Sequence, residues 1–105
     1  MIYEAGEKIL SEVVCEAEMT IKNAEGLHMR PAMQFVDVAS GFKSRVAIIK
    51  NGMEIDGKSI MQVSMLAATC GTKIIVRAEG PDAKEAIKAL RELVEVKLFG
   101  EPPPA

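Results

Sequence analysis

The segment Arg45-Val-Ala-Ile-Ile-Lys50-Asn51-Gly52-Met53-Glu-Ile-Asp56 decides how this chain folds. Asn51-Gly52 separates two short strand-forming runs. An Asn-Gly pair between such runs is the strongest two-residue hairpin signal, because both residues tolerate the positive φ angles of a tight turn. The segment therefore predicts two antiparallel strands, 45–50 and 53–56.

On the N-terminal side of this hairpin, the sequence predicts one strand and one helix. Residues 15–22 alternate strictly between apolar and polar side chains, as in a half-buried strand. A helix then begins close to His28, because Pro31 suits a first helical turn, and Gly41 is a natural C-terminal stop. The residues expected on its buried face recur at helical spacing: Ala32, Phe35, Val36 and Ala39.

On the C-terminal side, helix and strand signals alternate again. Ser59 is predicted to cap a short helix that ends at Gly71, and residues 73–79 alternate as a fourth strand. Helical periodicity over 83–94 then predicts the last helix. We expect residues 1–14 to form an N-terminal extension, in which Ile9, Leu10, Val13 and Val14 indicate a helical turn or two, and residues 99–105 to form a proline-rich tail.

The element order is strand, helix, strand, strand, helix, strand, helix, which is typical of a two-layer α+β sandwich in one domain over 15–98. Thirteen basic and fifteen acidic residues give a net charge of −2 and argue against nucleic-acid binding. No apolar run approaches the roughly 18 residues of a membrane span, and the acidic N-terminus does not resemble a signal peptide. We expect a cytoplasmic protein. Cys15 and Cys70 match no metal-ligand spacing, and we expect them to be reduced thiols.

The sequence Gly26-Leu27-His28-Met29-Arg30-Pro31-Ala32 contains the only histidine of the chain and is the candidate functional segment. A helix start presents unpaired backbone N–H groups and the positive end of a dipole, so His28 and Arg30 flank a place where an anion would bind. Arginine forms charge-assisted, bidentate hydrogen bonds to phosphoryl oxygens. We therefore hypothesise that His28 is a nucleophile beside an anion site the size of a phosphate. A lone histidine satisfied by the turn and a solvated surface arginine are the alternatives.

Two motifs carry a family resemblance. Asn23-x-x-Gly26-Leu27-His28-x-Arg30-Pro31-Ala32 resembles the active-site motif of HPr, the histidine-containing phosphocarrier of the bacterial phosphotransferase system, and Gly57-Lys58-Ser59-Ile60-Met61 is similar to the regulatory serine motif of that family. The resemblance implies the HPr-like open-faced β-sandwich, a four-stranded antiparallel sheet with three helices on one face.

The resemblance also implies a function. The protein would accept a phosphoryl group from enzyme I on Nδ1 of His28 and pass it to an enzyme IIA, with Arg30 stabilising the phosphate. It would be a stoichiometric carrier rather than an enzyme, and it would need no cofactor or metal. We expect a monomer, because a carrier must offer one face to successive partners.

The second motif implies regulation and docking. Members of the family with this motif are often phosphorylated on the residue matching Ser59 by HPr kinase/phosphorylase, and transcriptional regulators are possible further partners. Capping alone also explains a serine at this position. Met29, Ile60 and Met61 are expected to form a partner-docking surface, whereas Met65 is expected to pack in the core. Asp37 and Gln62 stand where familiar members have basic residues.

Three alternatives remain. The carrier could belong to the nitrogen-related branch, which passes phosphate to regulatory enzyme II proteins without moving sugar. It could instead be an interaction protein that acts through Ser59 alone. An RNA-binding module would need a basic or aromatic sheet face.

Overall fold

The computed structural model describes residues 13–102, and it confirms the predicted hairpin. β2 (Arg45–Lys50) and β3 (Met53–Asp56) pair antiparallel, with Lys50 opposite Met53. Asn51 and Gly52 have φ angles of 51° and 80°, as the tight turn requires.

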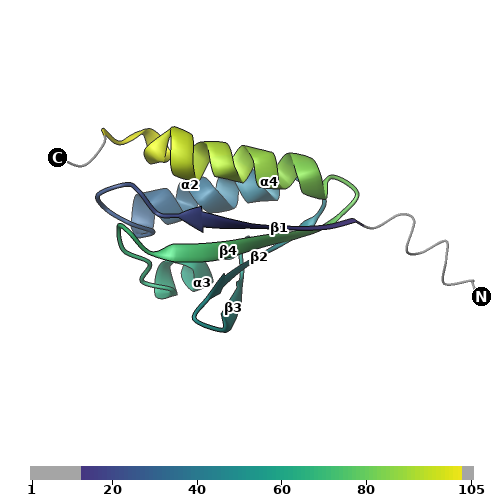
Figure 1. Cartoon of the computed structure of the whole chain (residues 1–105), viewed down its shortest axis with the longest axis horizontal. Coiled ribbons are helices and arrows are strands. Elements are labelled where there is room, and N and C mark those ends of the chain that lie inside the picture. The colour runs from purple at the N-terminus through teal and green to yellow at the C-terminus, as the bar shows by residue number, and fades with distance from the viewer. Residues whose placement is uncertain (1–12, 103–105) are drawn as a thin grey trace, which may run out of the picture.

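Two further strands complete one antiparallel sheet. β1 (Val13–Thr20) pairs with β4 (Lys73–Gly80), and β4 also pairs with β2, so the strand order is β1-β4-β2-β3. The helices α2 (Met29–Ser40) and α4 (Ala83–Arg91) lie side by side over the sheet (Figure 1). The short helix α3 (Ile60–Met65) packs against α2 and β3. The predicted open-faced α+β sandwich is confirmed.

The core lies between the sheet and the helices. Alternate residues of the strands point into it, as the period-2 pattern predicted, and Met19 and Ile21 are fully buried. The predicted face of α2 is buried as well, with Phe35 at its centre. The largest fully buried side chains are those of Phe35, Phe99, Met19, Ile21, Leu27, Ile48, Ile74 and Leu90.

Several predicted boundaries were wrong, including the strand expected over 15–22, which ends at Thr20. Val13 and Val14 belong to β1 rather than to a helical turn, because their backbone pairs with Gly80 and Glu79 of β4. The expected turn at residues 9 and 10 lies outside the described residues. The helix that begins after Ser59 ends at Met65, well before Gly71.

The early end of α3 has a visible cause. Ala67 takes a positive φ of 52°, which no continuing α-helix allows. The ammonium group of Lys50 donates to the carbonyls of Leu66 and Ala67, at 2.9 Å and 3.5 Å, and so satisfies acceptors that the helix end leaves unpaired. These long-range contacts terminate the helix before the glycine does.

The C-terminal boundary also differs from the expectation. After α4 the backbone takes a wider π-helical turn, η1 (Glu92–Val96), and then a 3-10 turn, η2 (Leu98–Gly100). Phe99 is fully buried, so the segment expected to be a tail is part of the domain at least through this residue. Among residues 13–102, no helix has the length and apolar character needed to cross a bilayer.

Candidate functional site

His28 is the N-cap residue of α2, as the sequence predicted. Its backbone is extended, its carbonyl accepts a 2.7 Å hydrogen bond from the N–H of Ala32, and its imidazole makes no capping bond. The residue is exposed. The first N–H groups of the helix are therefore not used by the cap side chain, and an anion bound at this end would meet them together with the positive end of the helix dipole.

The loop that carries His28 is braced on the segment that follows α3. Leu27 is fully buried, and its N–H donates to the carbonyl of Ala68 at 2.8 Å. Gly26 has a φ of +71°, and a Cβ atom built on it would lie 2.5 Å from the same carbonyl oxygen. Only glycine allows this close approach of the two backbones. The position of His28 thus depends on residues far away in the sequence.

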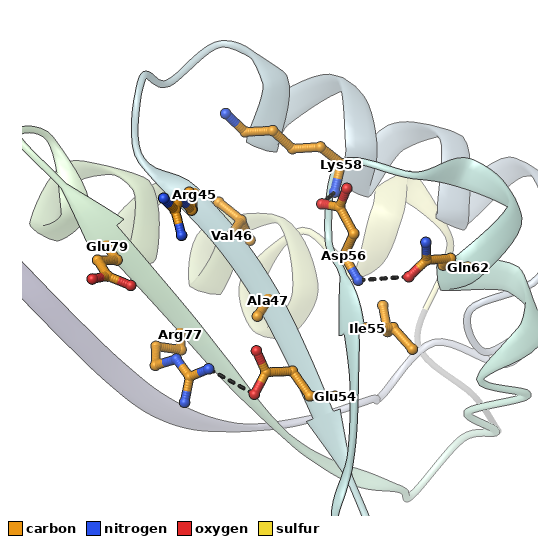
Figure 2. A pocket seen from close by; sticks show the side chains of 10 residues that line it. All are labelled: Arg45, Val46, Ala47, Glu54, Ile55, Asp56, Lys58, Gln62, Arg77 and Glu79. Carbon is orange, nitrogen blue, oxygen red and sulfur yellow. Dashed lines mark hydrogen bonds and ion pairs between the residues drawn. The ribbon is translucent and has the colours of Figure 1, made fainter.

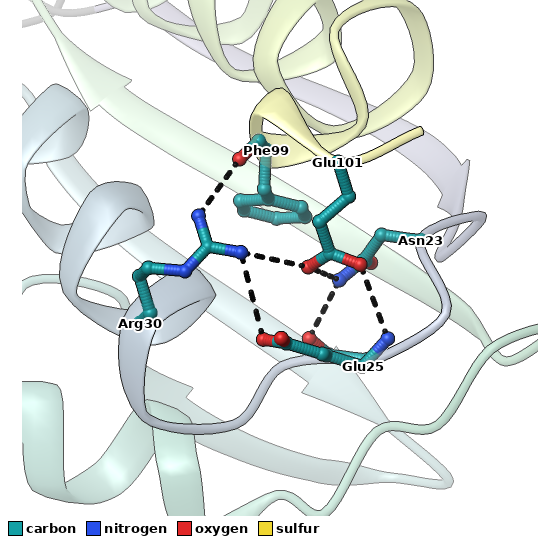
Figure 3. Close-up of polar contacts among 6 residues, drawn as sticks. Asn23, Glu25, Arg30, Phe99 and Glu101 are labelled. Atoms are coloured by element: carbon teal, nitrogen blue, oxygen red, sulfur yellow. Dashed lines mark hydrogen bonds and ion pairs between the residues drawn. The ribbon is translucent and has the colours of Figure 1, made fainter. Parts of the chain in front are cut away.

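Arg30 does not lie free in solvent. Its guanidinium donates to the carbonyl of Phe99 at 3.3 Å and forms ion pairs with Glu101 at 3.5 Å and Glu25 at 3.7 Å (Figure 3). The side chains of Arg30 and Glu25 are about half exposed, at 53% and 52%, whereas that of Glu101 is only 7% exposed. The guanidinium therefore keeps an accessible surface while two carboxylates orient it.

Asn23 connects this cluster to the turn before His28. It is fully buried, and its side-chain amide donates to the carbonyl of Gly26 at 2.9 Å and to Glu101 at 3.0 Å. The N–H of Glu25 donates to the second oxygen of Glu101 at 3.3 Å. Glu101 thus contacts the turn and Arg30 together, a role that sequence reasoning missed by placing the residue in a tail. The apolar Phe99 just before Gly100 was the available signal for a docked C-terminal segment.

Ser59 is the N-cap residue of α3, as predicted. Its hydroxyl oxygen accepts a 3.2 Å hydrogen bond from the N–H of Gln62, while the amide oxygen of Gln62 accepts one of 2.9 Å from the N–H of Asp56. The first bond caps the helix, and the second ties Gln62 to the end of β3 rather than to the N–H of Ser59, so the pair is not a full capping box. Ser59 is partly buried and lies at the start of a helix that packs against α2.

The apolar residues proposed for docking are exposed. Met29 and Met61 are 70% and 72% exposed, and Ile60 is 44% exposed. Met65 is 74% exposed, so the expectation that it packs in the core was wrong. In a helix this short, residues one turn after Met61 share its outward face, whereas Val63 supplies the buried contact.

A hollow in the described residues lies elsewhere. It measures about 440 Å³ and is lined by β2, β3, β4 and the start of α3 (Figure 2). Arg77 in its wall pairs with Glu54 at 2.6 Å and with Glu16 at 3.4 Å, so its charge is already compensated. Neither His28 nor Arg30 lines this hollow. Residues 13–102 also contain no cluster of three His, Cys, Asp or Glu residues that could hold a metal ion.

Comparison with known proteins agrees with the geometry. Residues 15–96 match the family model described as PTS HPr component phosphorylation site. The chain is 41% identical over 86 residues to the phosphocarrier protein HPr of Cupriavidus necator, covering 82% of this chain and 96% of that protein. It superposes on the solved structure of HPr-C-His from Thermoanaerobacter tengcongensis with a TM-score of 0.81 and 43% identity, covering 84% of this chain and 98% of that one.

A second solved structure, described as an HPr dimer from the same organism, matches with a TM-score of 0.64 and 44% identity, over 76% of this chain and 92% of that one. The match to the family model spans both helix starts and every strand of the sheet from residue 15 onward. The chain therefore belongs to the HPr family, the histidine-containing phosphocarrier proteins of the phosphotransferase system.

Proposed function

We propose that His28 accepts a phosphoryl group from phospho-enzyme I and passes it to an enzyme IIA in the cytoplasm. The observation that carries this proposal is the exposed imidazole at the N-cap of α2, which spends no hydrogen bond on capping its own helix. In the transfer, Nδ1 of His28 attacks the phosphorus, a new N–P bond forms, and the bond between phosphorus and enzyme I breaks. The chain is regenerated when an enzyme IIA takes the group, so it is a carrier and not an enzyme.

Arg30 is proposed to stabilise the charge of the transferred group. Phosphoryl transfer needs mainly alignment and electrostatic stabilisation, and a guanidinium supplies both through paired N–H donors. The carboxylates of Glu25 and Glu101 hold this guanidinium in the unphosphorylated protein, and the phosphoryl oxygens would compete with them. Removing one such donor typically costs a factor of roughly 100 in rate, which is the loss we expect for Arg30→Ala.

The direct test is labelling with enzyme I, phosphoenolpyruvate and magnesium. The wild-type chain is expected to acquire one acid-labile phosphate. Because His28 is the only histidine of the sequence, any phosphohistidine is located without ambiguity, and His28→Ala is expected to remain unlabelled. Cys70→Ser, a change on the surface outside the site, serves as the matched control and is expected to label normally. An unlabelled wild-type chain would contradict the assignment for this donor.

Ser59 is proposed to be a regulatory phosphosite and Met29, Ile60 and Met61 a docking surface for the successive partners. Incubation with HPr kinase/phosphorylase and ATP is expected to give an acid-stable phosphate that Ser59→Ala abolishes. A wild-type chain that gains no acid-stable phosphate would leave Ser59 with its capping role alone. Restoration of sugar uptake in an HPr-deficient strain separates the transport carrier from the nitrogen-related branch and from a purely regulatory protein.

The carrier is expected to act as a monomer, in contrast to the relative described as an HPr dimer. An open docking surface must be available to enzyme I and enzyme IIA in turn. Size-exclusion chromatography coupled to light scattering tests this, and a stable dimer would contradict it.

A further inference from the structure

Methionine dominates the exposed apolar surface around the start of α2 and along α3. Residues 13–102 contain six methionines, of which only Met19 is fully buried. Met29 and Met33 lie one turn apart on α2, with exposed fractions of 70% and 51%, and Met61 and Met65 repeat this spacing on α3, with 72% and 74%. Because α2 and α3 pack against each other, four accessible thioethers are carried by one pair of adjacent helices.

The choice of methionine has a chemical consequence that leucine would not have. A thioether adapts its shape to different partners, but a hydroperoxide oxidises it to a polar, chiral sulfoxide. Solvent access decides which methionines react first. On this basis the thioethers on α2 and α3 are open to peroxide, and the thioether of Met19 is shielded by the core.

We propose that Met29, Met33, Met61 and Met65 form an oxidation-sensitive modification site that controls partner docking. In each step the methionine sulfur attacks one oxygen of a hydroperoxide. The O–O bond breaks, an S–O bond forms, the sulfur loses two electrons, and the peroxide is reduced to water or an alcohol. This inference rests on the proposed function, because it extends the proposed docking surface of Met29, Ile60 and Met61 to the exposed Met33 and Met65 and assigns a consequence to it.

Oxidation should weaken docking while leaving the fold intact. A sulfoxide oxygen must give up its hydrogen bonds to water when a partner covers it, so an apolar contact becomes unfavourable. The transferring group is untouched, since neither His28 nor Arg30 is a target of this chemistry. The KM of enzyme I for the oxidised carrier is therefore expected to rise roughly tenfold or more, with a much smaller change in kcat.

The experiment measures enzyme I-dependent labelling of the full chain before and after treatment with hydrogen peroxide. Peptide mass spectrometry identifies which methionines have gained oxygen, and circular dichroism checks the fold. For the variant with all four residues changed to leucine, the KM of enzyme I is measured before and after peroxide treatment. The ratio of the two KM values is expected to stay near one. Met53→Leu is the matched control, because Met53 is 59% exposed but lies at the β2–β3 turn. Peroxide treatment is expected to raise the KM of this variant as much as that of the wild type.

Cysteine oxidation must be separated from methionine oxidation, because Cys70 is an exposed thiol. Dithiothreitol reverses disulfides and sulfenic acids but not sulfoxides, whereas methionine sulfoxide reductase restores methionine. The rise in KM after oxidation is expected to persist after dithiothreitol and to be reversed by methionine sulfoxide reductase.

Two outcomes overturn the inference by itself: normal labelling kinetics of a carrier whose four methionines are oxidised, or an equal peroxide effect in the four-leucine variant. Failure of the untreated wild-type chain to accept phosphate would instead overturn the proposed function, and this inference with it.

Discussion

The starts of α2 and α3 are alike in position and opposite in their use of the cap residue. Ser59 closes its own helix, because its hydroxyl accepts the N–H of Gln62, whereas His28 leaves the N–H groups of α2 without a side-chain cap. The start of α3 is thereby stabilised by its own cap residue, whereas the first N–H groups of α2 remain available to hydrogen-bond a ligand. The comparison shows that one local geometry is capped by its own side chain at Ser59 and left uncapped at His28, where we propose the phosphoryl transfer.

The two loops share a further feature, since a glycine stands two residues before each cap. Gly26 has a φ of +71° and approaches the backbone of Ala68, whereas Gly57 has no positive φ and packs against the side chain of Val46. A β-carbon at position 26 would meet a carbonyl oxygen at 2.5 Å, and one at position 57 would meet a methyl carbon at 2.7 Å. The His28 loop is therefore the more tightly constrained of the two.

The largest expected effect follows from this difference. Gly26→Ala should destabilise the protein by about 3 kcal/mol or more, because both the conformation and the backbone contact become unfavourable, and Gly57→Ala by about 1 to 2 kcal/mol through overpacking. Urea unfolding of the two variants measures the difference. Gly52→Ala controls for positive φ without close contact, since a β-carbon at this position would meet no atom within 4 Å. Equal losses for the changes at 26 and 57 would contradict the comparison.

The next effect concerns the brace between α3 and the His28 loop. Lys50→Met removes the donor to the carbonyls of Leu66 and Ala67, next to Ala68. We expect a loss of about 1 kcal/mol of stability together with changed NMR shifts of the His28 imidazole. Lys58→Met is the matched control, because its ammonium group donates at 2.8 Å to the carbonyl of Phe42, outside this brace. It should cost similar stability and leave the imidazole signals in place; identical spectra for both variants would show that the brace does not position His28.

An effect of the same size at Ser59, and a smaller one at His28, tests the caps directly. Ser59→Ala should cost about 1 kcal/mol, the usual value for losing an N-cap side chain, whereas His28→Ala should change stability by less than about 0.5 kcal/mol. Thermal and urea unfolding of the unphosphorylated variants measure both. A large destabilisation by His28→Ala would mean that the imidazole supports its helix after all.

A last, pH-dependent effect is expected at a third helix start, that of α4, where Asp82 is the N-cap residue. The hydroxyl of Ser44 and the backbone N–H groups of Lys43 and Ser44 donate to the carboxylate of Asp82, and these bonds lower the pKa of Asp82 to about 2 from its usual 3.8. Because the folded-state pKa is the lower one, this carboxylate stabilises the fold above pH 3.8, and the contribution is lost as the pH falls from 3.8 to about 2. Asp82→Asn should therefore be less stable than the wild type at neutral pH, and the gap should narrow over this acidic interval. A gap that is constant down to pH 2 would contradict the shift.

Much of the fold follows from short-range patterns. The hairpin at Asn51-Gly52, the buried face of α2 and the cap at Ser59 depend on residues within one or two turns of each other, so propensity and periodicity were enough to predict them. The prediction for Met65 failed because a six-residue helix buries only its Val63 side, and helical spacing alone does not say which side faces the core.

The candidate site likewise has features that local sequence patterns predict and features that depend on long-range contacts. The sequence alone determined that His28 stands at a helix start, with Arg30 in the first turn and Ser59 at a second start, because Pro, Gly and Ser act on their immediate neighbours. Only the tertiary structure decided that Glu101 would hold Arg30, that Ala68 would hold Leu27 and that the thioethers of α2 and α3 would face solvent. The contacts of Glu101 with Arg30 and of Ala68 with Leu27 join residues about 40 to 70 positions apart. No local pattern encodes these contacts or the exposed faces of α2 and α3, since both arise only when the sheet and helices pack into one core.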